Sequence, residues 1–256
     1  MILIGEKLNS SIPKTFEAFS QGDDNAIISL IKAQSSADYI DINTARCSDE
    51  LGMMEHVVSL VKEHTDCGIV LDSPDVSVLC KASEFIGDRK LIFNSVTADT
   101  DVSELLPIAK SLNAGIVVMP MRKIVPQTSE ERTEVALEII SRLDGISMEN
   151  IYIDAIAEAV STADNGASVT LDTIRTLRTK LPKSHIICGL SNISFGLPGR
   201  QAINSAFAAI AMSNGLDGAI LDVSSKQVMS SVYATQALLG LDEYCMDYIT
   251  YYRENE

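Results

Sequence analysis

Acidic and carboxamide side chains follow nearly every short apolar segment of this 256-residue chain. Seven of eight such segments end in Asp, Glu, Asn or Ser, and only the fifth ends otherwise, in Met119-Pro120-Met121. The polar residues at these ends are Glu6, Asn9, Asp41, Asn43, Asp72, Asn94, Ser95, Asp154, Asn192 and Asp222. Carboxylates accept hydrogen bonds from N–H groups, and carboxamides both donate and accept. Gathered in one place, these groups would recognise the hydrogen-bonding edge of a polar ligand.

The apolar segments that precede these residues predict strands separated by helices. Unbroken apolar character is typical of parallel strands that are covered on both faces. The predicted strands are 2–4, 39–42, 68–71, 90–93, 115–119, 151–153, 186–190 and 219–221. The predicted helices are 25–37, 53–63, 77–86, 102–112, 129–143, 168–181, 201–214 and 226–239. Asp101 with Glu104 predicts a capping box, Asn113 predicts a helix end, and Ser129 precedes two acidic residues that favour a first helical turn.

Eight alternating strand and helix units predict a (β/α)8 TIM barrel that forms a single domain over residues 1–256. A doubly wound open sheet is the alternative, but the even spacing favours closure, and no G-x-G-x-x-G follows the first strand. In a barrel the carboxyl ends of the strands meet on one face, so the polar residues would line one pocket. Any single Asp or Asn, such as Asp75 or Asp222, is better explained as a helix cap or loop residue than as a binding group. The interpretation therefore depends on the whole set.

Composition excludes several classes of function. The chain carries 20 Lys and Arg against 35 Asp and Glu, a formal charge of −15, without a basic cluster. Binding to nucleic acid is not expected, because phosphates require a basic face. Five scattered cysteines and three histidines lack the spacing of a metal site. No signal peptide or membrane span is predicted, and we expect a cytoplasmic protein.

A flat heterocycle with N–H donors and ring-nitrogen acceptors fits the predicted pocket. A carboxylate accepts from an amino group and an adjacent ring N–H, whereas a carboxamide pairs with either kind of group. A 2-amino-4-oxopteridine has this pattern. Oxygen ligands also suit Mg²⁺. That alternative ranks second because a cation would leave the carboxamides without a use, and we expect no metal.

Five motifs in this order resemble those of pterin-binding methyltransferases: IGEKLNSS, LDSPD, IFNSVTA, YIDAI and GLSNISFGLPGR. This family includes methyltetrahydrofolate:corrinoid-protein methyltransferases and the folate module of cobalamin-dependent methionine synthase. The resemblance runs from residue 1 to about Asp222. It implies a pterin-binding TIM barrel, usually a homodimer, that transfers a methyl group between N5 of tetrahydrofolate and the cobalt of a corrinoid.

The resemblance also implies roles for particular residues. Asp72, Asn94 and Asp154 match the residues that bind the pterin ring, and Asn192 matches the asparagine beside N5. Arg200 matches an arginine that meets the carboxylated tail of folate. The remaining residues fall in shared motifs: Glu6, Asn9, Asp41, Asn43, Ser95 and Asp222. One departure stands three residues after the asparagine, where corrinoid iron–sulfur-protein methyltransferases place Gln and this chain has Phe195.

The corrinoid is expected on a separate, transiently bound protein, because none of the histidines lies in a D-x-H-x-x-G motif. The direction of methyl transfer stays open. A dihydropteroate synthase is an alternative, although such enzymes carry Arg-x-His at the eighth strand, where this chain has LDVSSKQ. A non-catalytic folate-binding or corrinoid-docking protein is another. The aromatic tail, 243–256, predicts a helix that packs on the barrel or forms a dimer contact.

Overall fold

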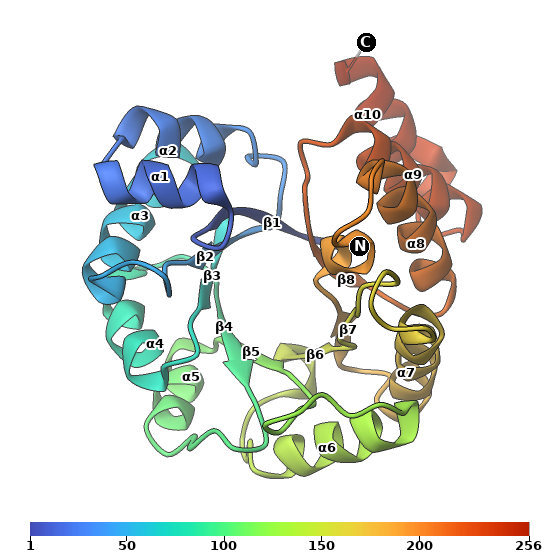
Figure 1. Cartoon of the computed structure of the whole chain (residues 1–256), viewed down its shortest axis with the longest axis horizontal. Coiled ribbons are helices and arrows are strands. Elements are labelled where there is room, and N and C mark those ends of the chain that lie inside the picture. The colour runs from blue at the N-terminus through green and yellow to red at the C-terminus, as the bar shows by residue number, and fades with distance from the viewer. Residues whose placement is uncertain (256) are drawn as a thin grey trace.

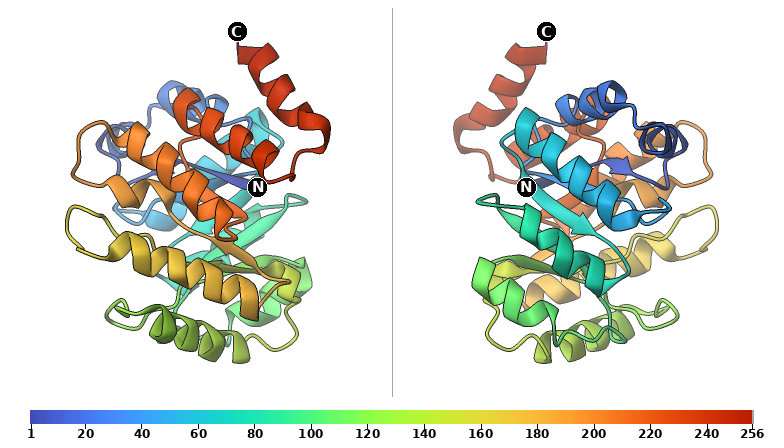
Figure 2. Two further views of the ribbon diagram at one scale, coloured as in Figure 1. Left: turned by 90° about the vertical axis from the view of Figure 1, so that its right-hand side faces the viewer. Right: turned by 90° about the vertical axis from the view of Figure 1, so that its left-hand side faces the viewer.

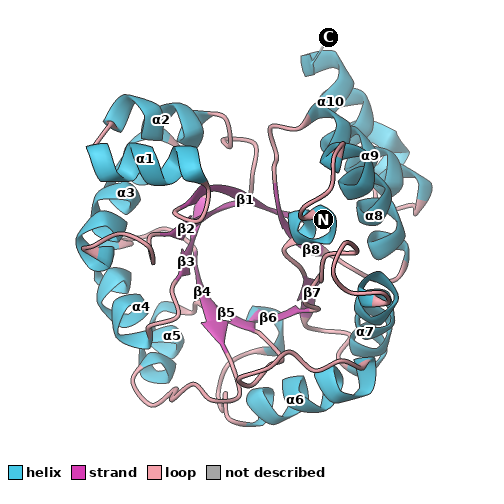
Figure 3. Cartoon of the chain, in the orientation of Figure 1, coloured by secondary structure: helices cyan, strands magenta, loops and turns pink. Residues whose placement is uncertain are grey.

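Eight parallel strands and the helices between them form a nearly closed (β/α)8 barrel in the computed structural model, which describes residues 1–255 (Figure 1, Figure 3). The strands are β1 Ile2–Asn9, β2 Tyr39–Asn43, β3 Gly68–Asp72, β4 Leu91–Val96, β5 Gly115–Val118, β6 Ile151–Asp154, β7 His185–Ile187 and β8 Gly218–Leu221. Backbone hydrogen bonds from Asp217 to Ile186 and from Ile220 to Cys188 join the two end strands, β7 and β8. The predicted barrel is confirmed.

Helices cover the outside of the barrel on every side (Figure 3). They are α1 Pro13–Gln21, α2 Asp24–Lys32, α3 Glu50–His64, α4 Val76–Ala82, α5 Leu105–Leu112, α6 Ser129–Ser141, α7 Gly166–Lys180, α8 Arg200–Ser213, α9 Lys226–Leu238 and α10 Met246–Asn255. Short 3-10 helices are η1 Ser83–Phe85, η2 Met148–Asn150, η3 Leu190–Ser194 and η4 Glu243–Cys245. All eight predicted helices occur; α1 was not predicted.

Two local predictions were wrong. Helix α5 begins at Leu105, and Asp101 accepts a hydrogen bond from the Ser103 backbone N–H in a turn before it, so Asp101 caps no helix. The seventh strand ends at Ile187, and the segment that contains Asn192 is the 3-10 helix η3. The other end signals are confirmed: Asn113 closes α5 in the left-handed conformation, with a φ of 49°, and α6 begins at Ser129.

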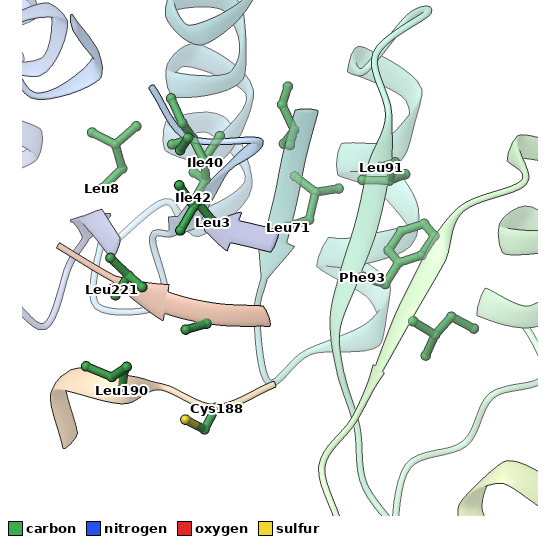
Figure 4. Packing of buried hydrophobic residues seen from close by; sticks show 14 of the residues in the cluster. Leu3, Leu8, Ile40, Ile42, Leu71, Leu91, Phe93, Cys188, Leu190 and Leu221 are labelled. Atoms are coloured by element: carbon green, nitrogen blue, oxygen red, sulfur yellow. The ribbon is translucent and has the colours of Figure 1, made fainter. Parts of the chain in front are cut away.

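Two apolar layers hold the barrel together. The larger lies between strands and helices, and Figure 4 shows part of it, including Leu71 and Phe93. The smaller fills the barrel interior and is made of Ile4, Val70, Ile92, Val117, Tyr152 and Ile187. Each of these six residues belongs to a different strand. Side chains alternate between the two faces of a strand, so the residue two positions further along each strand also faces the interior.

The aromatic C-terminal segment forms the predicted helix, α10, which projects beside α9 near the edge of the barrel (Figure 2). Tyr251 of α10 stacks on Tyr233 of α9 with ring centroids 4.5 Å apart. This contact confirms that the tail packs on the barrel. None of the helices within residues 1–255 combines the length and the apolar composition of a membrane-spanning segment.

Candidate functional site

A cavity of about 500 Å³ opens at the carboxyl end of the barrel. It is lined by Glu6, Asn9, Ser11, Ile12, Pro13, Asp41, Asp72, Asn94, Met119, Asp154, Gly189, Ser191, Asn192, Phe195, Arg200 and Ile220. Eight of the eleven residues predicted for the site are in this lining. The exceptions are Asn43, Ser95 and Asp222. The carboxyl ends of the strands thus bring the predicted groups together, as expected for this fold.

The alternation of side chains along each strand explains why polar groups line this end. Asp72 lies two residues after Val70, and Asp154 lies two residues after Tyr152. Val70 and Tyr152 belong to the smaller apolar layer inside the barrel, so the two carboxyl groups also face the interior, one layer closer to the carboxyl end. Asn94 follows Ile92 in the same way. The cavity therefore has an apolar floor beneath a polar wall.

Strand register places the polar wall in one row. Backbone pairing sets Asn9 opposite Asn43, Asn43 opposite Asp72, and Asp72 opposite Asn94, across four neighbouring strands. Within this row the Asn43 carboxamide donates to Asp72 Oδ2 at 2.8 Å and accepts from Ser10 Oγ at 3.1 Å. Asn43 is not among the lining residues, but this hydrogen bond fixes the orientation of the Asp72 carboxyl group.

Other contacts complete the wall. Asn94 Nδ2 donates to Asp41 Oδ1 at 3.3 Å, which leaves the Asn94 carbonyl oxygen as an acceptor. Ser191 Oγ donates to Glu6 Oε1 at 2.8 Å, joining η3 to β1. Ser95 and Asp222, the two remaining predicted residues, contact other side chains instead of lining the cavity. Ser95 Oγ lies 3.9 Å from the Met119 sulfur.

Asp222 lies at the end of β8 and takes part in an ion pair instead of lining the cavity. Its Oδ2 accepts from Lys7 Nζ at 2.6 Å, and its Oδ1 accepts from the backbone N–H and the hydroxyl of Ser224. Asp75 is the cap of α4, accepting from the Ser77 backbone N–H at 2.8 Å. The capping interpretation is thus right for Asp75.

Four carboxyl groups share this cavity, and burial raises the pKa of each. The pKa values of Asp72 and Asp154 rise to about 6, chiefly because burial penalises the charged form. Burial and the nearby Asp72 carboxylate raise the pKa of Asp41 well above its ordinary value. Glu6 is shifted in the same direction, mainly by burial. Near neutral pH the site therefore offers ionised acceptors from Asp72 and Asp154, and burial disfavours the charged forms of Asp41 and Glu6.

These shifts predict how the stability of the free protein depends on pH. Asp154 has a folded-state pKa of about 6 against an ordinary 3.8, so the folded state holds this proton more tightly. Its stabilising contribution is complete below the ordinary value and is lost as the pH rises through about 6. We expect the free energy of unfolding to fall by about 1 kcal/mol for this group between pH 5 and 7.5.

Urea denaturation across this pH range measures the effect. Asp154→Asn should remove its share of the pH dependence, whereas the same change at the exposed Asp88 should leave the dependence intact. An identical pH profile for wild type and Asp154→Asn would contradict the assignment of this proton to Asp154.

The η3 segment carries Asn192 to the rim of the cavity. The backbone N–H of Asn192 donates to Gly189 O at 3.1 Å, and its carbonyl oxygen accepts from Phe195 N at 3.0 Å. None of the side-chain hydrogen bonds within residues 1–255 involves the Asn192 carboxamide. A Cβ atom on Gly189 would lie 2.9 Å from Asn192 Nδ2, so this glycine allows the close approach. The Asn192 amide is free to meet a ligand.

Arg200 is the one cationic side chain among the cavity-lining residues that the structure describes. Its guanidinium donates from Nε to Ser194 Oγ at 3.0 Å and from Nη2 to Ser191 O at 2.6 Å. Arg200 therefore fixes the shape of η3 as well as facing the cavity. Phe195 lies at the same rim with 65% of its surface exposed.

Some lining residues were not predicted. Ile12 and Pro13 line the cavity from the segment between β1 and α1, where no helix was predicted. Over the described residues, no group of three or more His, Cys, Asp or Glu side chains is arranged to hold a metal ion.

Curated relatives match the chain over all or nearly all of its length. The chain is 31% identical to a methylcorrinoid:tetrahydrofolate methyltransferase of Eubacterium limosum, with 100% of this chain and 97% of that protein covered. It is 27% identical to a methionine synthase of Mycobacterium tuberculosis, covering 94% of this chain but 22% of that longer protein.

Solved structures with the same fold include dihydropteroate synthases. One from Coxiella burnetii, in complex with pteroic acid, has a TM-score of 0.68 at 17% identity, over 94% of this chain and 93% of that one. Another from Yersinia pestis, with a pterine–sulfa conjugate, has a TM-score of 0.67 at 14% identity, over 94% and 93% of the two chains. At this identity the likeness concerns the fold alone. The family model described as "Pterin binding enzyme" matches residues 5–222, and the chain therefore belongs to the pterin-binding enzyme family.

Proposed function

We propose that this protein is a methyltransferase that moves a methyl group between N5 of tetrahydrofolate and a corrinoid presented by a separate protein. One observation supports this most directly. Asp72, Asn94 and Asp154 face one cavity, and the unpartnered carboxamide of Asn192 stands at its rim. The full-length likeness to a methylcorrinoid:tetrahydrofolate methyltransferase supports the same reaction class.

The polar wall suits the pyrimidine edge of a pterin. Asp72 and Asp154 would accept hydrogen bonds from the 2-amino group and the adjacent ring N–H, because both are ionised above a pH of about 6. Asn94 retains a free carbonyl oxygen, since its Nδ2 donates to Asp41. Several fixed partners on one edge would hold the ring in a single orientation. That orientation points the N5 edge at the rim.

We assign transfer from methylcorrinoid to tetrahydrofolate as the working direction, after the reaction named for the relative with 31% identity. The electron pair of N5 attacks the methyl carbon, the carbon–cobalt bond breaks, and the cobalt keeps the bonding pair. The N5 proton leaves to solvent or to a nearby carboxylate. In the reverse reaction N5 is the leaving group and must gain that proton. Asn192 would stabilise N5 in either direction, since an amide can accept from N–H or donate to the lone pair.

A corrinoid protein would reach N5 through the open carboxyl end of the barrel. The exposed Phe195 ring is at this rim, where corrinoid iron–sulfur-protein methyltransferases place a polar Gln. An apolar ring suits contact with a macrocycle. The corrinoid would come from a transient partner, because the folate ring would itself occupy the cavity of about 500 Å³.

Visible spectroscopy under anaerobic conditions tests the proposal with free cobalamin in place of the partner protein. Methylcobalamin mixed with tetrahydrofolate and this protein should be converted to cob(I)alamin, and methyltetrahydrofolate with cob(I)alamin should form methylcobalamin. Folate binding without conversion of either cobalamin would indicate a folate-binding protein that does not catalyse methyl transfer. Condensation of hydroxymethyl-dihydropterin pyrophosphate with p-aminobenzoate would instead identify a dihydropteroate synthase.

A further inference from the structure

Arg132 of α6 is the largest side chain that is fully buried in the part of the chain that the structure describes. Its side chain is 0% exposed, although a guanidinium group is costly to bury without partners. Nε donates to Pro126 O at 2.9 Å, and Nη1 donates to Ala155 O at 3.0 Å and Ile156 O at 2.7 Å. Nη2 forms an ion pair with Glu158. One buried side chain thus links the β5–α6 loop to the β6–α7 loop.

The β6–α7 loop contains a strained residue at the point that Arg132 holds. Ile156 has a φ of 55°, a left-handed conformation that β-branched residues rarely adopt. Its carbonyl oxygen accepts from Arg132 Nη1 and also from Thr170 Oγ1, at 2.9 Å. Such strain persists only when surrounding contacts hold the backbone in place, and it is common at functional sites. Arg132 and Thr170 supply these contacts from two different helices.

The strained conformation has a consequence for the cavity. The Ile156 backbone N–H donates to Asp154 Oδ1 at 2.7 Å. This bond fixes the carboxyl group at the end of β6 and leaves its second oxygen to face the cavity. Arg132 also acts on Asp154 through its charge, because the guanidinium attracts the carboxylate and lowers the pKa that burial raises. The Asp72 carboxylate on β3 has the opposite effect and raises the pKa of Asp154. The Cys188 thiol lies just after β7, and burial and the charge of Asp154 raise its pKa.

We propose that Arg132 is a positioning residue: it holds Ile156 in its strained conformation and thereby orients the Asp154 carboxyl group for ligand binding. Assigning folate as this ligand rests on the function proposed above. The orientation and charge of Asp154 are properties of the free protein, so they are measured without any ligand.

Arg132→Gln tests the proposal against Arg142→Gln as its matched control. Arg142 stands at the end of the same helix and donates to the backbone carbonyls of Ala98 and Thr100 in another loop. Carboxyl-carbon NMR of the free protein measures the pKa of Asp154. We expect Arg132→Gln to raise it by about one pH unit, since an opposite charge nearby favours the ionised form by at least that much. Arg142→Gln should leave it unchanged.

Calorimetry of methyltetrahydrofolate binding then follows affinity between pH 5 and 8. In Arg132→Gln the loss of affinity on acidification should begin about one pH unit higher than in wild type. Arg132→Lys keeps the charge but loses the forked contact with two carbonyl oxygens, so affinity should fall without a shift in pH dependence. A merely structural arginine would reduce stability or affinity at every pH alike, and that result would overturn the proposal.

Glu158→Gln covers the case in which Arg132 variants fail to fold. Glu158 is partly exposed, and removing its charge leaves Arg132 less neutralised. The pKa of Asp154 should therefore fall, which is the opposite of the Arg132→Gln shift. An unchanged or raised pKa would contradict the proposal. If the shifts occur but wild type binds no folate, the positioning role stands and the proposed function fails.

Discussion

Asn192→Ala is expected to slow methyl transfer about 100-fold, the effect typical of losing one preorganised hydrogen-bond donor at a site of changing charge. The carboxamide stands at the rim of the cavity, and no hydrogen bond within residues 1–255 occupies it. Charge at N5 changes during transfer, whereas the pyrimidine edge keeps its charge. The rate should therefore fall much more than folate affinity, which we expect to weaken less than tenfold.

The chemistry of the carboxamide explains why a carboxylate would serve less well. A tertiary amine is a poor leaving group, so N5 needs a proton or a strong hydrogen bond as it departs. An amide donates at any physiological pH and can rotate to accept when N5 carries a proton. A carboxylate donates only when protonated, and this cavity already holds four carboxyl groups. Asn192→Asp should therefore be slow near neutral pH and recover in part on acidification.

Single-turnover kinetics with methyltetrahydrofolate and cob(I)alamin, together with calorimetry, separate rate from binding. Asn150→Ala is a suitable control, because Asn150 is a half-buried asparagine in η2, just before the start of β6, and does not line the cavity. Gly189→Ala offers an independent route: its Cβ would lie 2.9 Å from Asn192 Nδ2 and push the amide away. Wild-type turnover in Asn192→Ala would rule out the proposed role.

Much of the site could be predicted because strand ends and side-chain alternation are local properties. An apolar segment that ends in Asp or Asn implies both the strand and the face to which the polar residue points. Closure of the barrel then brings Asp72, Asn94 and Asp154 to one cavity without further information. The register that aligns Asn43 with Asp72 follows from the same parallel pairing.

Other features depend on tertiary contacts and have no clear sequence signal. Arg132 lies in the sequence SEERTE, which is typical of an exposed helix face, yet its side chain is fully buried. The left-handed Ile156 is equally unexpected, since Gly or Asn would normally mark such a position. Helix α1 begins at Pro13, soon after β1, within a segment too polar to be distinguished from a loop. Asn192 was placed at a strand end, but η3 carries it instead.

Asp154→Asn is expected to weaken folate binding about 100-fold at pH 7.5. A hydrogen bond to a charged group contributes about 1.5–3 kcal/mol, and the substituted amide would also turn a donor toward the N–H groups of the ligand. In wild type the pH dependence has a definite sign. Asp72 and Asp154 are ionised above a pH of about 6 and neutral below it, so affinity should fall as the pH drops through that value.

The stability of the free protein should change in the opposite direction over the same range. Ligand-free stability rises on acidification because these carboxyl groups hold their protons more tightly when folded, whereas affinity falls because the ligand requires the anions. Opposite pH trends in urea denaturation and in calorimetry, both reduced in Asp154→Asn, would show that protonation of the Asp154 carboxyl group causes both the change in stability and the change in affinity. Two trends of the same sign would show that binding does not use the ionised carboxyl group. Asp88→Asn, remote from the cavity, should reproduce the wild-type trends in both measurements.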